Sequence, residues 1–332
     1  MSSDLVVVTT SERSSFRRCP QQWYWRYRMG LIPKGESPDA LWFGIGVHIA
    51  LAEWYKLGLK RGPHPAKTFA EWCGEEEREI RASYGDRDSE WYDEPKFEDA
   101  RDLGIAMLEG YVDQYGKDPT WDVIAIEQQF RITLMRAGVP IAEFWSTFDG
   151  VYRDLADRGK IKLMEHKTTR AIQPAYLALD DQGGAYWAVA GYLLRKNGIL
   201  KPGEDIAEIT YNFLRKAQPD PRERNSEGAY LNLDGSVSKK QPPPLFAREP
   251  VERHPAEQKR QLERLSDEVA VMNAMRSGEL PITKSTTKDC TFCEFFVMCQ
   301  LHERGGDKWL SLQRSEYYQR NPYDRYLKSA GG

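Results

Sequence analysis

The chain has 332 residues, of which 29% are charged and 12% aromatic, and its net charge is −3. This length and composition are typical of a soluble globular enzyme with one large domain or two ordinary ones, and they exclude a disordered or fibrous chain. Because there is no overall basic field, a nucleic-acid partner would have to be met by a local patch of positive charge.

The first third of the chain is predicted to be helical. Residues 11–28 predict a capped helix, then a Cys-Pro step and a dense aromatic-basic stretch. Residues 41–62 predict a second helix that ends at Gly62, and charged helical sequence continues to about Tyr115.

The pattern then changes to short strands. Three β-rich runs cover residues 121–134, 141–155 and 160–169, and "ADRGK" supplies a tight turn between the last two. The elements that follow are a helix at 173–198, a strand at 207–217, a Pro-rich polar loop or flap at 217–250 and a helix at 255–280. This order predicts an α/β fold with a central mixed β-sheet flanked by helices.

The strand pair at 141–169 carries residues that could perform hydrolysis. Asp149 lies in one predicted strand, and Glu165 and Lys167 lie in the next. Since strand side chains alternate, Glu165 and Lys167 share a face, and hairpin pairing can bring Asp149 beside them. Two carboxylates and an ammonium group suit metal-assisted phosphodiester hydrolysis with Mg²⁺ or Mn²⁺. The alternative is a solvated Glu-Lys pair on an edge strand.

Two helices carry further candidates, each with an ordinary structural alternative. His48 shares a helical face with Leu51 and Tyr55, where a core histidine is the alternative to a metal ligand. Gln182 and Tyr186 lie four residues apart on one helix face, where ordinary helix packing is the alternative to a site role.

The aromatic-basic stretch at 13–28 interleaves five arginines with Phe, Trp and Tyr. Guanidinium groups for phosphates beside rings for bases predict a track for a single strand of nucleic acid. The alternative is an aromatic cluster with arginines at its rim, and both can hold at once.

Three cysteines fall within ten residues in "CTFCEFFVMC", which predicts part of a metal or iron–sulfur site that needs a fourth ligand. The candidates are Cys19, far away in the sequence, and His302, which is close by. A bond from Cys19 would close a very long loop and so act as a structural clasp. The odd number of five cysteines argues against a secreted disulfide framework, and no signal peptide or membrane span is evident, so we expect a cytoplasmic protein.

These motifs occur in a definite order: "SERSSFRRCPQQWYWRY", "GIGVH", an Asp, "EHK", "QGGAY" and the cysteine cluster. Together they resemble the RecB-like branch of the PD-(D/E)XK nucleases. The resemblance extends to the iron–sulfur exonucleases typified by the fourth family of CRISPR-associated proteins and their stand-alone phage relatives. It covers residues from about 11 to 305.

The resemblance implies a restriction-endonuclease-like fold with one nuclease domain over residues 1–332 and termini joined by an iron–sulfur cluster. Its expected parts are a helical N-terminal part at 1–120, a catalytic core at 121–216, the loop at 217–250, a C-terminal helix with the cysteines at 251–305 and a tail at 306–332. The motif acid is Glu165, where many relatives carry Asp.

The resemblance also implies roles for individual residues. The divalent metal would be held by His48, Asp149, Glu165 and the backbone carbonyl of His166, and Lys167 would be the catalytic lysine. Gln182 and Tyr186 would steady the site and the DNA. The ligands of a 4Fe–4S cluster would be Cys19, Cys290, Cys293 and Cys299.

The function expected from these features is a metal-dependent DNA exonuclease that acts on single strands or DNA ends, with relatives suggesting 5′ to 3′ travel. The chain has no P-loop motif, so it cannot unwind duplex DNA by itself. The alternatives are an endonuclease or end-processing nuclease in a recombination or CRISPR-type assembly, and a nonenzymatic zinc module that binds DNA. An oligomer is possible.

Overall fold

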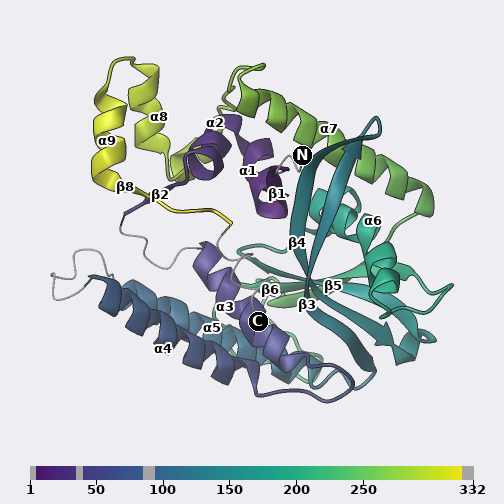
Figure 1. The fold of residues 1–332 in the computed structure, drawn as a ribbon. Helices are drawn as coiled ribbons and strands as arrows, with labels where there is room; N and C mark the ends of the chain where they lie inside the picture. Colours follow the sequence, from purple (N-terminus) through teal and green to yellow (C-terminus); the bar gives the residue numbers. More distant parts are fainter. Residues whose placement is uncertain (1–4, 35–39, 85–93, 324–332) are drawn as a thin grey trace. The chain divides into compact units, whose positions relative to one another are not determined.

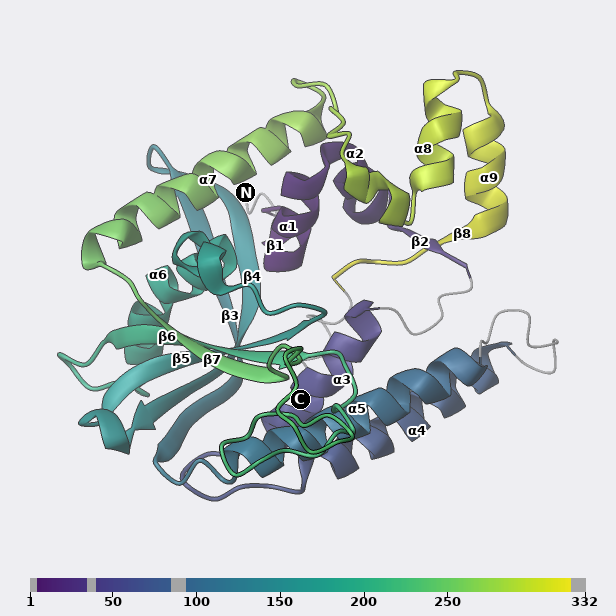
Figure 2. The same cartoon turned by 180° about the vertical axis from the view of Figure 1, so that it is seen from behind.

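The computed structural model describes residues 5–34, 40–84 and 94–323. The chain forms two compact units (Figures 1 and 2). The central unit comprises Ser37–Gln128 and Phe148–Pro255, and the terminal unit comprises Met1–Glu36, Gln129–Thr147 and Ala256–Gly332. In the described ranges, no helix has the length and apolar character needed to cross a membrane.

A six-stranded mixed sheet runs through the fold. Strands β1 (Val7–Thr9), β4 (Val139–Asp154), β5 (Lys160–Thr169), β6 (Ile206–Arg215) and β7 (Phe246–Glu252) lie in this order, and β3 (Trp121–Arg136) pairs with β4. Pairing is antiparallel between β4 and β5 and between β6 and β7, and it is parallel between β5 and β6. The predicted mixed sheet flanked by helices is therefore present.

Three helices cover the sheet of the central unit with an aromatic core. They are α3 (Ala40–Trp54), α4 (Pro65–Tyr84) and α5 (Glu94–Tyr115), which lie side by side in Figures 1 and 2. Gly46 lets α3 approach α4 closely, because a Cβ there would come within 2.1 Å of the Trp72 ring. This packing fixes the face of α3 that carries His48.

Two predicted helices are shorter in the structure than in the sequence pattern. The helix predicted to end at Gly62 ends at Trp54, because Gly58 adopts a positive φ of 85° and bridges to Val123 of β3. The helix predicted at 173–198 consists of a 3₁₀ segment, η3 (Pro174–Leu179), and α6 (Asp181–Lys196). Asp180 separates the two, since its side chain accepts a hydrogen bond from the Gly183 amide at 3.0 Å and begins α6.

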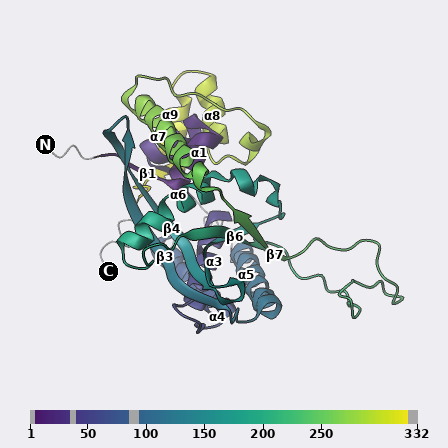
Figure 3. The same ribbon diagram turned by 90° about the vertical axis from the view of Figure 1, so that its right-hand side faces the viewer.

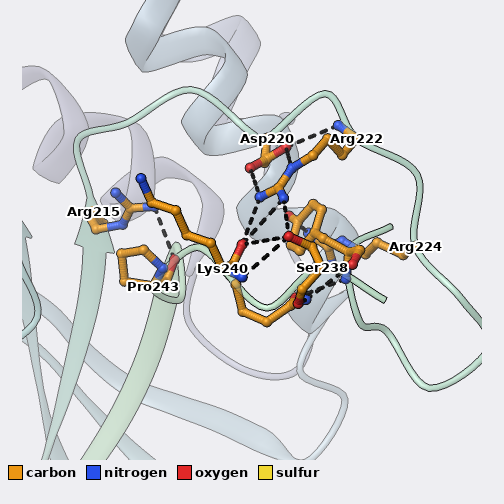
Figure 4. A network of polar contacts seen from close by, with 9 residues as sticks. Arg215, Asp220, Arg222, Arg224, Ser238, Lys240 and Pro243 are labelled. Atoms are coloured by element: carbon orange, nitrogen blue, oxygen red, sulfur yellow. Dashed lines mark hydrogen bonds and ion pairs between the residues drawn. The ribbon is translucent and has the colours of Figure 1, made fainter. Parts of the chain in front are cut away.

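The segment between β6 and β7, residues 216–245, forms an arm that projects from the central unit (Figure 3). Polar contacts hold it instead of a hydrophobic core (Figure 4). Arg222 donates to Asp220 at 2.7 Å and to Ser238 at 2.9 Å, and its guanidinium also lies over the ring of Tyr230. The arm is thus ordered by its own charges.

The terminal unit joins the two ends of the chain. Its elements are β1, α1 (Thr10–Arg18), α2 (Pro20–Trp23), the π-helical turn η1 (Tyr24–Arg28), β2 (Leu31–Pro33), α7 (Pro255–Ser277), η4 (Lys288–Phe292), α8 (Phe296–Glu303), α9 (Lys308–Glu316) and β8 (Tyr317–Gln319). Strand β2 pairs with β8, and Trp25 packs with Phe295 and Tyr317 in one core.

The aromatic-basic stretch lies within this terminal unit, and its tryptophans are not available to nucleic acid. Trp23 and Trp25 are buried, at 0% and 2% exposure. Arg17 pairs with Glu268 at 2.7 Å, and Arg26 pairs with Glu294 at 2.8 Å. The prediction that these rings stack on bases is therefore wrong for the two tryptophans, because both rings are buried in the core of the terminal unit.

Candidate active site

The pairing of β4 with β5 brings two buried carboxylates together in the central unit. Gly150 is opposite Met164, so that Asp149 and Glu165 come side by side. The Asp149 Oδ2 atom accepts a hydrogen bond from the His166 backbone amide at 2.6 Å. The two carboxylates are 7% and 2% exposed, respectively. Two buried carboxylates this close together raise the free energy of the folded state unless cations or hydrogen-bond donors compensate their charges.

A lysine and an amide provide that compensation. Lys167 Nζ donates to Glu165 Oε1 at 2.8 Å and to Gln182 Oε1 at 2.9 Å, while Gln182 Nε2 donates to the same Glu165 oxygen at 2.8 Å. Gln182 Nε2 also donates to the Tyr186 hydroxyl at 3.2 Å. The alternation of β5 and the four-residue spacing on α6 therefore bring these four predicted site residues into one network.

Helix α3 adds His48 to this group, and β3 adds a residue that the sequence reasoning missed. His48 Nδ1 lies 3.1 Å from Asp149 Oδ1. Glu127 joins them, and the potential ligand atoms of His48, Glu127 and Asp149 all lie within 4.8 Å of one another. One imidazole and carboxylate oxygens are a donor set that suits Mg²⁺ or Mn²⁺.

Glu127 reaches this position through an unusual backbone conformation. Its φ is 43°, in the left-handed region that a non-glycine residue rarely adopts within a strand. Such a kink can turn a side chain out of the regular alternation of a strand. The sequence shows only an acidic residue inside a β-rich run, and nothing in that run reveals the kink.

Burial and neighbouring charges shift the proton affinities of these groups in opposite directions. Burial raises the pKa of Glu165 to about 7, with the charge of Asp149 adding to the rise and Lys167 opposing it. Burial also disfavours the charged form of Asp149, but His48 and the hydrogen bond from His166 outweigh this and lower its pKa to about 2. The site thus separates one ionised carboxylate from one that titrates near neutrality.

Cation binding is expected to displace a proton from His48. Burial lowers the pKa of His48, but the charge and hydrogen bond of Asp149 outweigh it and raise the pKa to about 9. A ring nitrogen must be deprotonated to bind a metal, so Mn²⁺ affinity should rise about tenfold per pH unit from pH 7 towards 9. At pH 8, where Glu165 has already ionised, binding should release about one proton.

Calorimetry in buffers of different ionisation enthalpy measures that proton release directly. The His48→Asn variant serves as the control, because it should bind Mn²⁺ more weakly and should lose the rise in affinity between pH 8 and 9, where the titration of Glu165 contributes little. An affinity of the unmodified protein that stays constant between pH 7 and 9 would contradict the assignment of His48 as a ligand.

A second buried network supports the strand that carries the site. Asn212 of β6 lies 2.9 Å from His166 Nδ1 and donates to the Tyr111 hydroxyl at 2.8 Å. Arg248 of β7 donates to Tyr111 at 2.8 Å and to Asp118 at 2.5 Å. Burial lowers the pKa of His166 to about 3, so its ring stays neutral. No pattern in the sequence indicates this network, because its members come from distant elements.

The four predicted cluster cysteines lie in the terminal unit. Arg18 donates to the Asp289 carbonyl at 3.3 Å, so the residues next to Cys19 and Cys290 are in contact. Burial raises the pKa of Cys293 to about 11, and the charge of Cys19 adds to this rise. Burial and the charge of Cys19 likewise raise the pKa of Cys299.

The rival fourth ligand, His302, packs against two tryptophan rings. Its ring makes edge contacts with Trp25 and Trp309, at centroid distances of 5.8 and 5.3 Å. Among the described residues, the cysteine sulfur atoms do not gather as a group of three potential metal ligands in the way that His48, Glu127 and Asp149 do, so the cluster and its fourth ligand stay predictions.

Comparison with known proteins gives the family. One solved structure, named "Putative exonuclease" from Eubacterium rectale, is similar at 13% sequence identity and a TM-score of 0.40, with 85% of each chain covered. No curated protein sequence matches. A family model described as the PD-(D/E)XK nuclease superfamily matches residues 8–300, which include every residue of the site. The chain therefore belongs to the PD-(D/E)XK nuclease superfamily.

Proposed function

We propose that this protein is a divalent-metal-dependent deoxyribonuclease of the RecB-like branch, an exonuclease acting on single strands or DNA ends. The observation that carries the proposal is the network in which Lys167 and Gln182 converge on the buried Glu165 within hydrogen-bonding distance. A purely structural pair would not need a second buried carboxylate and a histidine beside it. Membership of a nuclease superfamily gives the reaction class.

The residues have separate roles in this proposal. His48, Asp149, Glu165 and the carbonyl of His166 hold the cation, and Glu127 adds a further carboxylate. When bound, a divalent cation supplies Lewis-acid activation of the scissile phosphate. Lys167, held by Glu165 and Gln182, orients the attacking water and offsets the negative charge that develops on the phosphate. Tyr186 fixes the amide of Gln182.

The test uses 5′- and 3′-labelled linear single strands and a covalently closed single-stranded circle, with Mg²⁺, Mn²⁺ or EDTA. An exonuclease should degrade the linear strands only, and EDTA should stop it. Rapid cleavage of the circle would instead identify an endonuclease, or an end-processing nuclease that works within a recombination or CRISPR-type assembly. No hydrolysis of any DNA with either metal would reject the proposed activity.

We also propose that Cys19, Cys290, Cys293 and Cys299 hold a 4Fe–4S cluster that joins the two ends of the chain. The contact of Arg18 with Asp289 and the electrostatic coupling of Cys19 to Cys293 support this arrangement. Thiolates are the ligands that iron–sulfur clusters require. The role is structural, because the cluster would close the loop between α1 and η4.

Anaerobically purified protein is therefore expected to be brown, with iron and sulfide in similar amounts. Cys19→Ala should bleach it and reduce its solubility, whereas His302→Ala should keep the colour. The buried Cys73, which lies in the central unit, provides the matched control as Cys73→Ala. Colourless protein with one zinc ion that depends on His302 rather than Cys19 would contradict the cluster.

A further inference from the structure

In the chain, the 3₁₀ segment η3 connects the strand that carries Lys167 to the helix that carries Gln182. Leu177 points inward and is 2% exposed. Arg253, just beyond β7, donates to the Leu177 carbonyl at 3.1 Å and to the Asp180 carbonyl at 2.7 Å. The Tyr211 hydroxyl donates to the Asp180 carboxylate at 2.8 Å. The C-terminal half of η3 is thus fixed, although it is a surface segment.

The outer face of η3 presents apolar groups to solvent. Tyr176 is 50% exposed and Leu179 is 78% exposed, although each flanks the buried Leu177. Exposing a large aromatic group on a segment held this firmly contributes little to folding stability, since the burial that would stabilise it is incomplete. A function in binding explains the arrangement better than packing does.

Tyr176 lies near the catalytic groups because η3 leads through Asp180 directly into α6, whose second residue is the Gln182 that accepts a hydrogen bond from Lys167. Burial raises the pKa of Tyr176, the charge of Lys167 opposes the rise, and the charges of Asp180 and Glu165 add to it. The other aromatic ring of the site network, Tyr186, is 6% exposed and packs edge-on against Phe148. An aromatic surface for a ligand at this site therefore comes from Tyr176 rather than Tyr186.

We propose that Tyr176, flanked by Leu179, is the stacking platform for the nucleobase next to the scissile phosphate. This inference rests on the proposed nuclease function and adds the contact that recognises the substrate as nucleic acid. Base stacking on an aromatic side chain tolerates every base, because each base has a π-face. The platform therefore positions the strand for cleavage without sequence preference.

The first experiment compares oligonucleotides that are intact or carry one abasic unit at successive positions from the end. Single-turnover cleavage by the unmodified protein should slow about tenfold when the abasic unit occupies the stacked position. Tyr176→Ala should slow about tenfold on intact DNA and should no longer respond to the abasic unit. Tyr176→Phe should retain the response, because stacking needs the ring and not the hydroxyl.

The matched control is Tyr192→Ala on α6, since Tyr192 is 59% exposed and takes no part in the site network. It should cleave intact and abasic DNA as the unmodified protein does. Equal sensitivity of Tyr176→Ala and the unmodified protein to the abasic unit would overturn the platform. The platform would also be overturned if Tyr176→Ala were slower than the unmodified protein by the same factor on intact and on abasic DNA, while Tyr192→Ala kept the normal rate.

Measurements of DNA binding without hydrolysis distinguish the proposed platform from the proposed nuclease activity. In EDTA, fluorescence anisotropy should show weaker binding of intact DNA to Tyr176→Ala, and the same affinity of both proteins for the abasic strand. If the unmodified protein bound DNA in this way but hydrolysed none, the nuclease proposal would fail and the platform would stand. If it cleaved DNA but Tyr176→Ala bound and cleaved like the control, the platform alone would fail.

Discussion

Replacing Lys167 with methionine is expected to slow DNA hydrolysis by about 10²- to 10³-fold, the effect of removing one charged donor from a reacting centre. Methionine keeps much of the lysine stem but cannot donate to Glu165 or Gln182, which both accept from Nζ in the structure. The fold should survive, because the lysine side chain is 21% exposed and Gln182 still donates to Glu165. Affinity for DNA should change little, since phosphate contacts elsewhere supply most of it.

The same substitution should also change how metal binding depends on pH. Burial raises the pKa of Glu165 to about 7, and the charge of Lys167, with a smaller effect of His48, limits the rise. Without Lys167 the pKa of Glu165 should rise further, so that more of the carboxyl is protonated at pH 7. Mn²⁺ affinity should then fall at pH 7 and recover at higher pH, which calorimetry between pH 6 and 9 would measure.

Lys162→Met is the matched control for this prediction. Lys162 lies on the same strand and pairs with Asp154, Asp157 and Glu208, at distances of 3.0 to 3.1 Å, outside the site network. Loss of Lys162 should lower the stability of the fold while leaving the rate of DNA hydrolysis by the folded protein unchanged. Wild-type hydrolysis by Lys167→Met, or an equal loss of rate in Lys162→Met, would show that the assigned site is wrong.

The strand pair at the centre of the site was predictable because local geometry determines it. The "ADRGK" turn fixes which strands pair, and alternation along β5 puts Glu165 and Lys167 on one face. Gln182 and Tyr186 follow from the helical period. Their convergence on Glu165 depends on how α6 packs on the sheet, which the sequence pattern does not contain.

The residues that the sequence reasoning missed depend on backbone breaks or on distant partners. Glu127 reaches the ligand group through a φ of 43°, and Tyr176 is presented because Asp180 ends η3 and begins α6. Neither feature changes the apolar periodicity from which elements are predicted. The tryptophans of the aromatic-basic stretch show the converse, since composition suggested nucleic-acid contacts where the fold uses them as core.

The network behind the site should be one of the points at which a single substitution most lowers the stability of the fold. Arg248 donates to both oxygens of Asp118, at 2.5 and 2.8 Å, and its guanidinium lies 3.7 Å from the centre of the Tyr115 ring. Asp118 is 8% exposed, so removing Arg248 leaves a buried charge without its ion-pair partner, although the Tyr55 hydroxyl still donates to it at 2.7 Å. Arg248→Met is therefore expected to lower the free energy of unfolding by about 3–5 kcal/mol.

Urea denaturation of the single variants Arg248→Met and Asp118→Asn and of the double variant measures this coupling. The double variant should be more stable than the sum of the two single losses predicts, because Asp118→Asn removes the buried carboxylate charge that Arg248→Met leaves without its ion-pair partner. Arg222→Met provides the control: it breaks a pair of similar geometry with Asp220 in the solvent-exposed arm, where screening should leave the unfolding midpoint unchanged. Additive losses in the double variant would mean that Arg248 stabilises the protein through its ring contacts. Because Tyr111 also joins Arg248 to Asn212 and His166, Arg248→Met should also speed hydrogen exchange of the His166 amide, which donates to Asp149. Unchanged exchange of the His166 amide would mean that the network stabilises the fold but does not influence the site.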